Sequence, residues 1–183
     1  MEFFKQLLRT PNRRIAAIGL FVYAFDQLTK WLVLASVPRG PDGVVIIPGF
    51  FKLVNWGNTG AAFSMFFGNN ATLAIIALVA LLVLFLSRHH FESRTLLGQI
   101  AFGLIFGGII GNLTDRLMPG RLQVIDFIRF YLDRPNGEVG FPAFNIADSG
   151  ICVGVVLVFW ITWRSERAKP QAVDDAKQEQ GPT

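Results

Sequence analysis

Two aspartates lie in apolar surroundings, each beside a long hydrophobic stretch of the chain. Asp126 has two apolar residues on either side, and Asp148 follows Asn145 by three residues near the start of the last hydrophobic stretch. Two close carboxylates share one proton, so one acts as base on a water while the other protonates a carbonyl or a leaving amine. That is the chemistry of an aspartic protease. The alternatives are a carboxylate that only favours a helix N-terminus, for Asp148, and a solvated loop residue, for Asp126.

Two further charges lie within the first hydrophobic stretch. Asp26 and Lys30 are four residues apart, which places them on one face of a helix. Charged groups at membrane depth are costly, and a functional interpretation is the default. Three interpretations stay open: an ion pair that fixes helix packing, a contact to substrate or to a lipid headgroup, or support of a catalytic group.

Two more polar groups are candidates for a site. Asn112, Asp115 and Arg116 share one helix face near the end of the third hydrophobic stretch, and Asn145 can share the face of Asp148. The first group is either an interfacial cap or part of a site. The run 58–64, which contains Asn58 and Gly60, is either a turn that enters a helix or a set of donors that holds an extended peptide.

Other chemistries have weaker support in the sequence. No His/Cys cluster has metal-ligand spacing. Cys152 lies inside the last hydrophobic stretch with no His near it in sequence, which favours a core thiol over a nucleophile. A Ser–Lys peptidase would pair Ser64 or Ser149 with Lys30 or Lys52, and it remains an alternative although nothing singles out such a pair.

The composition is that of a small helical membrane protein. Of 183 residues, 52% are hydrophobic and 16% are charged, against roughly 25% charge in a soluble domain; mean hydropathy is +0.45. These values exclude a disordered protein, a collagen-like fibre and a basic DNA-binding domain. Hydrophobic stretches at 15–37, 71–87, 95–117 and 144–163 predict four transmembrane helices, because about 20 apolar residues cross the hydrocarbon core. We expect an all-α integral-membrane fold, one domain over residues 1–164.

Basic residues set the expected orientation. They flank three helix ends, at Lys5, Arg9, Arg13, Arg14, Arg88, Arg94, Arg164, Arg167 and Lys169. Since basic residues accumulate on the cytoplasmic side, both termini should be cytoplasmic. Residues 165–183 are read as a polar cytoplasmic tail without fixed structure. Within the third stretch, Gly103-x-x-x-Gly107-x-x-x-Gly111 predicts close approach of another helix.

Two outer segments, 38–69 and 118–143, connect the predicted helices. In the first, the strand-like runs 44–47 and 51–54 are separated by Pro48-Gly49, which predicts a small hairpin or sheet on the outer membrane face. In the second, Pro135-Asn136-Gly137 marks a turn. Asp126 falls just after the third helix, at the start of this second segment.

Five blocks of polar and small residues follow one another along these spans. They are Asp26-Gln27-x-x-Lys30, the run 58–64, Gly107-Gly108-x-x-Gly111-Asn112-x-x-Asp115-Arg116, Val124-Ile125-Asp126-Phe127 and the run 141–149. Together they closely resemble the lipoprotein signal peptidases (signal peptidase II) of bacteria. The resemblance covers nearly the whole chain apart from the two termini.

This resemblance implies an aspartic endopeptidase of the bacterial inner membrane, with catalytic residues at Asp126 and Asp148 near the outer face. It implies cleavage of prolipoproteins just before a diacylglyceryl-modified cysteine, with no metal or organic cofactor. A small outer β-sheet and a mobile outer helix would fall within 38–64. Supporting or substrate-binding roles are implied for Asp26, Lys30, Asn58, Gly60, Asn112, Asp115, Arg116 and Asn145. The expected partners are the diacylglyceryl-prolipoprotein and membrane phospholipid, without nucleic acid, and we expect a monomer.

Two functions outside the peptidases are also considered. A proton- or ion-coupled transporter would use Asp26, Asp115, Asp126 and Asp148 as a relay, but it needs polar residues through the full membrane depth. Three of these aspartates are instead expected at the outer side. A lipid or lipoprotein chaperone would use the same cavity and would tolerate Asp→Asn changes at both candidate catalytic positions.

Overall fold

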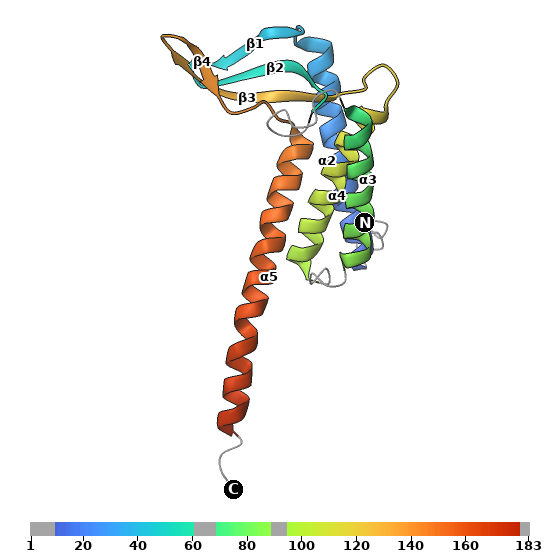
Figure 1. Cartoon of the computed structure of the whole chain (residues 1–183), viewed down its shortest axis with the longest axis vertical. Coiled ribbons are helices and arrows are strands. Elements are labelled where there is room, and N and C mark those ends of the chain that lie inside the picture. Colours follow the sequence, from blue (N-terminus) through green and yellow to red (C-terminus); the bar gives the residue numbers. More distant parts are fainter. Residues whose placement is uncertain (1–9, 61–68, 89–94, 180–183) are drawn as a thin grey trace, which may run out of the picture.

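The computed structural model describes residues 10–60, 69–88 and 95–179. Within these ranges, four long helices stand side by side and a four-stranded sheet covers one end of them (Figure 1). The helices are α2 (Pro11–Ser36), α3 (Asn70–Ser87), α4 (Leu96–Leu117) and α5 (Ile146–Glu179). All four are long and apolar enough to cross a membrane, which confirms the predicted class. We call the part of the bundle under the sheet the sheet end.

Local sequence explains where three of the helices begin. The side chains of Thr10, Asn69 and Thr95 each accept a backbone N–H from the first turn of the helix that follows. Such N-caps satisfy donors that have no partner within the helix. Each of the three helices begins within a few residues of its predicted start, because the cap residues lie at or shortly before the starts of the hydrophobic stretches.

Glycines on α4 allow it to pack between α2 and α5. A Cβ atom on Gly107 would lie 2.5 Å from the backbone oxygen of Gly19 on α2. A Cβ atom on Gly108 would lie 2.4 Å from the backbone oxygen of Ala147 on α5. The expectation that small residues let helices approach closely is therefore confirmed. In contrast, only Leu73 and Ala74 of α3 are buried.

The sheet has the order β1-β2-β3-β4, and all neighbours are antiparallel. Its strands are β1 (Gly40–Ile47), β2 (Phe51–Asn58), β3 (Val124–Arg134) and β4 (Gly137–Gly140). The hairpin predicted around Pro48-Gly49 and the turn predicted at Pro135-Asn136 are confirmed. Val33 of α2 and Val37, which follows the end of that helix, pack with Ile125 and Phe127 of β3 in one buried cluster. This cluster fixes the start of β3 on the helix bundle.

The structure differs from the sequence-based expectations in the C-terminal tail. Helix α5 continues through the tail to Glu179, where we predicted no fixed structure from residue 165 onwards. The tail is rich in Ala, Glu, Gln and Lys, which are strong helix formers and extend the helix despite their polarity. In the segment 38–64, where a small sheet and an outer helix are expected, β1 and β2 form the sheet. Residues 61–64 lie outside the described residues, so the outer helix stays a prediction.

Candidate active site at the sheet end of the bundle

Asp126 lies on β3 with its carboxylate held by two amide groups. The strand is buried from Val124 to Phe127, so Asp126 is only 4% exposed. The side-chain amides of Asn58 and Asn145 each donate to one of its oxygens at 2.8 Å. Burial raises the pKa of Asp126 to about 7; the nearby Asp148 carboxylate also raises it, and the two amide hydrogen bonds oppose the shift. Asp126 therefore holds a proton at a pH where an exposed aspartate is ionised.

Asp148 lies in the first turn of α5 and takes part in the cap of that helix. The backbone N–H of Asp148 donates to the Asn145 side-chain oxygen at 2.9 Å, and the Asn145 backbone N–H donates back to Asp148 Oδ2 at 3.2 Å. This reciprocal pair is a capping box, which fixes both side chains. The other carboxylate oxygen accepts from the amide of Asn112 on α4 at 2.7 Å.

One pair of asparagines connects the two carboxylates. Asn145 Nδ2 donates to Asp126 and also to Asn112 Oδ1, the latter at 3.2 Å. Asn112 in turn donates to Asp148. Asp126 and Asp148 therefore share one hydrogen-bonded frame, and the charge of Asp148 raises the pKa of Asp126. Carboxylates that interact strongly titrate as a pair.

Next to Asn112 of this frame lies a fully buried cluster of three charged side chains. Lys30 Nζ forms ion pairs with Asp26 at 2.8 Å and with Asp115 at 2.7 Å, and all three side chains are 0% exposed. The same ammonium donates to Asn112 Oδ1 at 3.0 Å. Lys30 thus uses its three donors on groups from two helices. An ion cluster buried this deeply requires such complete partnering to offset its loss of hydration.

The charge cluster also positions the backbone beside each aspartate. Asp26 accepts the backbone N–H of Ala147 at 2.9 Å, and Asp115 accepts the backbone N–H of Ile125 at 3.4 Å. Ile125 and Ala147 directly precede Asp126 and Asp148 in the chain. The cluster therefore links α2 and α4 to the two backbone segments that carry the candidate pair.

Arg116 and Gly60 border the same site. Arg116 donates to the backbone oxygen of Gly60 at 3.1 Å and to that of Asn112 at 3.3 Å. The Gly60 N–H donates to the Asn58 side chain at 2.8 Å. All ten predicted site residues consequently belong to one connected network of hydrogen bonds and ion pairs. The predicted run 58–64 continues through 61–64, which lie outside the described residues.

Two side chains that contact Asp115 were not among the predicted site residues. Gln27 donates to Asp26, to Asp115 and to the backbone oxygen of Gly111, each at 3.2 Å. Arg121 forms an ion pair with Asp115 at 2.6 Å. Gln27 stands inside the Asp26-Gln27-x-x-Lys30 block, which was a usable signal. Arg121 lies in a polar connection after α4, where the sequence offers no sign of its partner.

The structure also bears on the other chemistries. Among the described residues, no three His, Cys, Asp or Glu side chains could together hold a metal ion. The Ser149 hydroxyl donates to the backbone oxygen of Asn145. Lys30 is engaged by two carboxylates, and Lys52 forms an ion pair with Glu138. Both lysines are thus engaged by carboxylates, and Ser64, the other serine of this alternative, lies outside the described residues.

The fold and the site together define a membrane protein with two carboxylates in one hydrogen-bonded frame at one end of a helix bundle. Residues 18–164 match the family described as signal peptidase (SPase) II. The chain belongs to the signal peptidase II family, and is thus a membrane peptidase.

Named relatives and solved structures agree with this assignment. The lipoprotein signal peptidase of Azoarcus sp. is 42% identical over 158 residues, covering 82% of this chain and 83% of the relative. The lipoprotein signal peptidase of Bacillus subtilis is 38% identical over 143 residues, covering 78% and 88%. A bacterial membrane enzyme solved by the in meso method at 2.3 Å is 32% identical, with a TM-score of 0.73 over 85% of this chain and 90% of that one.

Proposed function

We propose that this chain is an aspartic endopeptidase that removes the signal peptide from diacylglyceryl-modified prolipoproteins, just before the lipidated cysteine. Asp126 and Asp148 are the catalytic pair. The names of the relatives support the substrate class. The observation that carries the mechanism is the shared frame, in which Asn112 and Asn145 hold both carboxylates by direct hydrogen bonds.

Proton movements between the two aspartates and a water complete the reaction. In the reaction that we propose, Asp126, whose pKa is raised to about 7 by burial and the neighbouring charge, starts protonated and Asp148 starts ionised. Asp148 takes a proton from water as the water oxygen attacks the scissile carbonyl, and Asp126 protonates the carbonyl oxygen. The C–N bond of the resulting gem-diol then breaks. Asp148 returns its proton to the leaving amine, and a hydroxyl of the gem-diol returns one to Asp126.

The surroundings of the pair suit an extended, membrane-anchored peptide. Backbone and amide groups at Asn58 and Gly60 border the site and supply the kind of donors and acceptors that hold a peptide backbone. The signal helix and the acyl chains of the substrate remain in lipid, while the scissile bond reaches the membrane face where water is available. The enzyme acts as a monomer, with membrane phospholipid around it.

The orientation follows from charge and from the site. Arg13, Arg14 and Arg88 lie at helix ends opposite the sheet, where a cytoplasmic excess of basic residues is expected. We therefore place both termini in the cytoplasm of a bacterium and the sheet at the outer face of its inner membrane. A prolipoprotein whose modified cysteine lies at that outer face would meet the pair directly.

The decisive test uses purified protein in detergent and a diacylglyceryl-modified prolipoprotein peptide. Wild type, Asp126→Asn and Asp148→Asn are compared, each with and without a metal chelator. Asp133→Asn is the matched control, because Asp133 is an exposed aspartate on the same strand as Asp126. Circular dichroism and thermal unfolding establish that each variant is folded.

The expected result is cleavage before the lipidated cysteine by wild type and by Asp133→Asn, unaffected by the chelator and lost in both other variants. Cleavage that persists in Asp126→Asn or Asp148→Asn would overturn the aspartic mechanism and return attention to a Ser–Lys pair. Tight peptide binding without cleavage by wild type would favour a lipoprotein chaperone.

A further inference from the structure

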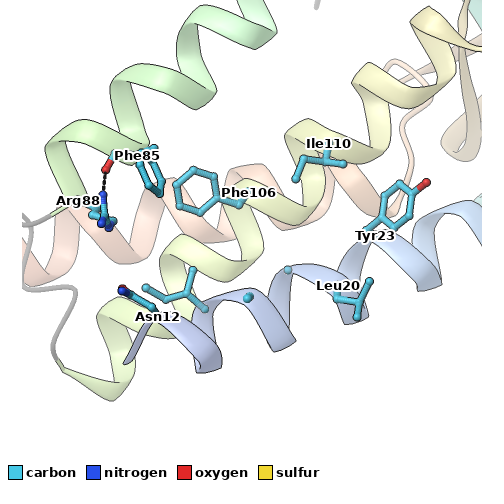
Figure 2. Close-up of a pocket in the computed structure, with 10 residues that line it drawn as sticks. Asn12, Leu20, Tyr23, Phe85, Arg88, Phe106 and Ile110 are labelled. Carbon is cyan, nitrogen blue, oxygen red and sulfur yellow. Dashed lines mark hydrogen bonds between the residues drawn. The ribbon is translucent and has the colours of Figure 1, made fainter. Parts of the chain in front are cut away.

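A cleft with a volume of about 580 Å³ lies between α2, α3 and α4, away from the candidate active site. None of the ten site residues lines it. Figure 2 shows Asn12, Phe85 and Arg88 at one end of this cleft and Tyr23 at the other. Because α3 runs from the sheet end towards Ser87 (Figure 1), the Arg88 end of the cleft lies opposite the sheet. Its volume is in the range of about 300–1,000 Å³ that is usual for ligand sites.

The cleft has the length of one membrane leaflet. It runs along α2 from Asn12 to Tyr23, and eleven residues of helix rise about 16 Å. The hydrocarbon core of a bilayer is about 30 Å thick. Apolar side chains such as Phe106 and Ile110 of α4 line the part between the two ends. An acyl chain of the leaflet opposite the sheet therefore matches the cleft in both depth and polarity.

Charge distinguishes the end of the cleft at Arg88. Arg88 is the one charged residue in the lining, and its side chain is half-buried. Its guanidinium stacks over the Phe85 ring, 4.0 Å from the ring centroid, and donates to the Phe85 backbone oxygen. Within the described ranges, no carboxylate forms an ion pair with Arg88. A guanidinium has five N–H donors in a geometry that suits phosphate.

We propose that this cleft binds an anionic phospholipid, with one acyl chain along α2 and α4 and the headgroup phosphate on Arg88. Basic pockets between transmembrane helices are suited to anionic headgroups. The signal helix of a substrate fits less well for two reasons. Its basic N-terminal region would meet the positive charge of Arg88, and a helix with side chains is about 10 Å wide.

Lipid retention in detergent tests this site without any need for cleavage. The full chain is incubated with phosphatidylglycerol or with phosphatidylcholine of identical acyl chains, and bound lipid is counted by native mass spectrometry. Arg88→Gln removes the charge, and Ala16→Trp fills the apolar part, since Ala16 lines the cleft. Arg167→Gln is the matched control, because Arg167 stacks on Trp163 of α5 and does not line the cleft.

Wild type and Arg167→Gln should retain phosphatidylglycerol in preference to phosphatidylcholine. Arg88→Gln should lower retention of phosphatidylglycerol about fivefold and remove the preference, since one arginine near a membrane surface contributes about that factor. Ala16→Trp should lower retention of both lipids.

Equal retention of the two lipids by wild type would overturn the proposal. So would unchanged lipid retention in Arg88→Gln together with a raised KM for the prolipoprotein peptide, which would assign the cleft to the signal helix. A failure to cleave peptide would count against the proposed function only.

Discussion

The two ends of the helix bundle hold charge in different ways. At the sheet end, Asp26, Lys30 and Asp115 are fully buried, and each has partners on other elements of the fold. At the opposite end, Arg88 is half-buried beside an apolar cleft, and its ring contact and its hydrogen bond are both to Phe85 on the same helix. Charges at the sheet end therefore link helices and strands to one another. Within the described residues, Arg88 at the end of α3 contacts its own helix.

Helices α4 and α3 also differ in how closely they pack against the rest of the bundle. Helix α4 is buried along most of its length between α2 and α5, and it approaches them through glycines. Helix α3 exposes most of its side chains and is buried only at Leu73 and Ala74. The closely packed part of the bundle is thus the part that positions the aspartates. The loosely packed helix is the one that forms a wall of the cleft.

The largest expected effect separates the two ends by removing one charge from each. Lys30→Met leaves two buried carboxylates without their ammonium, so the free energy of unfolding should fall by about 3–5 kcal/mol. Peptide cleavage should be lost as well, because Asn112 and the backbone beside both aspartates lose their support. Arg88→Met should change the free energy of unfolding by less than about 1 kcal/mol, because Arg88 has no ion pair within the described residues. Denaturant unfolding in one detergent measures both, and equal losses would contradict the distinction between the two ends.

The next effect compares the two kinds of helix surface. Gly107→Ala places a Cβ atom 2.5 Å from the backbone oxygen of Gly19. Since backbone must shift to relieve this contact, the free energy of unfolding should fall by about 1–3 kcal/mol. Val79→Leu on α3 adds one methylene at a position that is 54% exposed, and it should have almost no effect. Thermal unfolding of both variants measures the difference, and a tolerant Gly107→Ala would show that α4 is not tightly packed.

The helices and the first hairpin can be predicted from the sequence, because residues close together in the chain determine them. The lengths of the hydrophobic stretches fix the four helices, and Pro48-Gly49 fixes the first hairpin. The candidate site could also be predicted, because polar residues such as Asp26 and Lys30 are too costly at membrane depth to be accidental. Their spacing placed them on one helix face, which the ion pair at 2.8 Å confirms.

The remaining features depend on partners distant in the chain. The sequence placed Asp126 among apolar residues, but β3 needs β2 as its hydrogen-bonding neighbour, and that pairing has no local signal. Arg121 meets Asp115 because the chain turns back after α4, and Gln27 reaches Gly111 across two helices. The site is thus predictable as a set of residues, and its network is not.

A smaller effect concerns pH and the sheet end alone. Burial, and then the charge of Asp148, raise the pKa of Asp126 to about 7. Above that pH the pair loses its last proton, so kcat/KM should fall about tenfold per pH unit. Because the folded pKa exceeds the unfolded value of 3.8, the stability that Asp126 contributes is complete below pH 3.8 and is lost as the pH rises through about 7.

Peptide cleavage assays at a series of pH values test the fall in kcat/KM. Unfolding curves between pH 3.8 and about 7 test the loss of stability, with Asp126→Asn as the control. That variant should lack the loss of stability between the two pKa values. Phospholipid retention in the cleft should not follow this titration, because no acidic residue lines the cleft. Activity that stays constant above pH 7 would contradict a protonated pair.

The smallest effect tests whether burial or position sets the cost of a charge at the sheet end. Lys52 on β2 forms an ion pair with Glu138 at 2.7 Å, but Glu138 on β4 is 39% exposed. Lys52→Met should therefore lower the free energy of unfolding by only about 1 kcal/mol, since water can replace the lost partner. Glu138→Gln is the matched variant and should cost no more. Lys52→Met could instead lower the free energy of unfolding as much as Lys30→Met does. In that case, the position of a charge at the sheet end would determine its contribution to stability, and the burial of both partners would not.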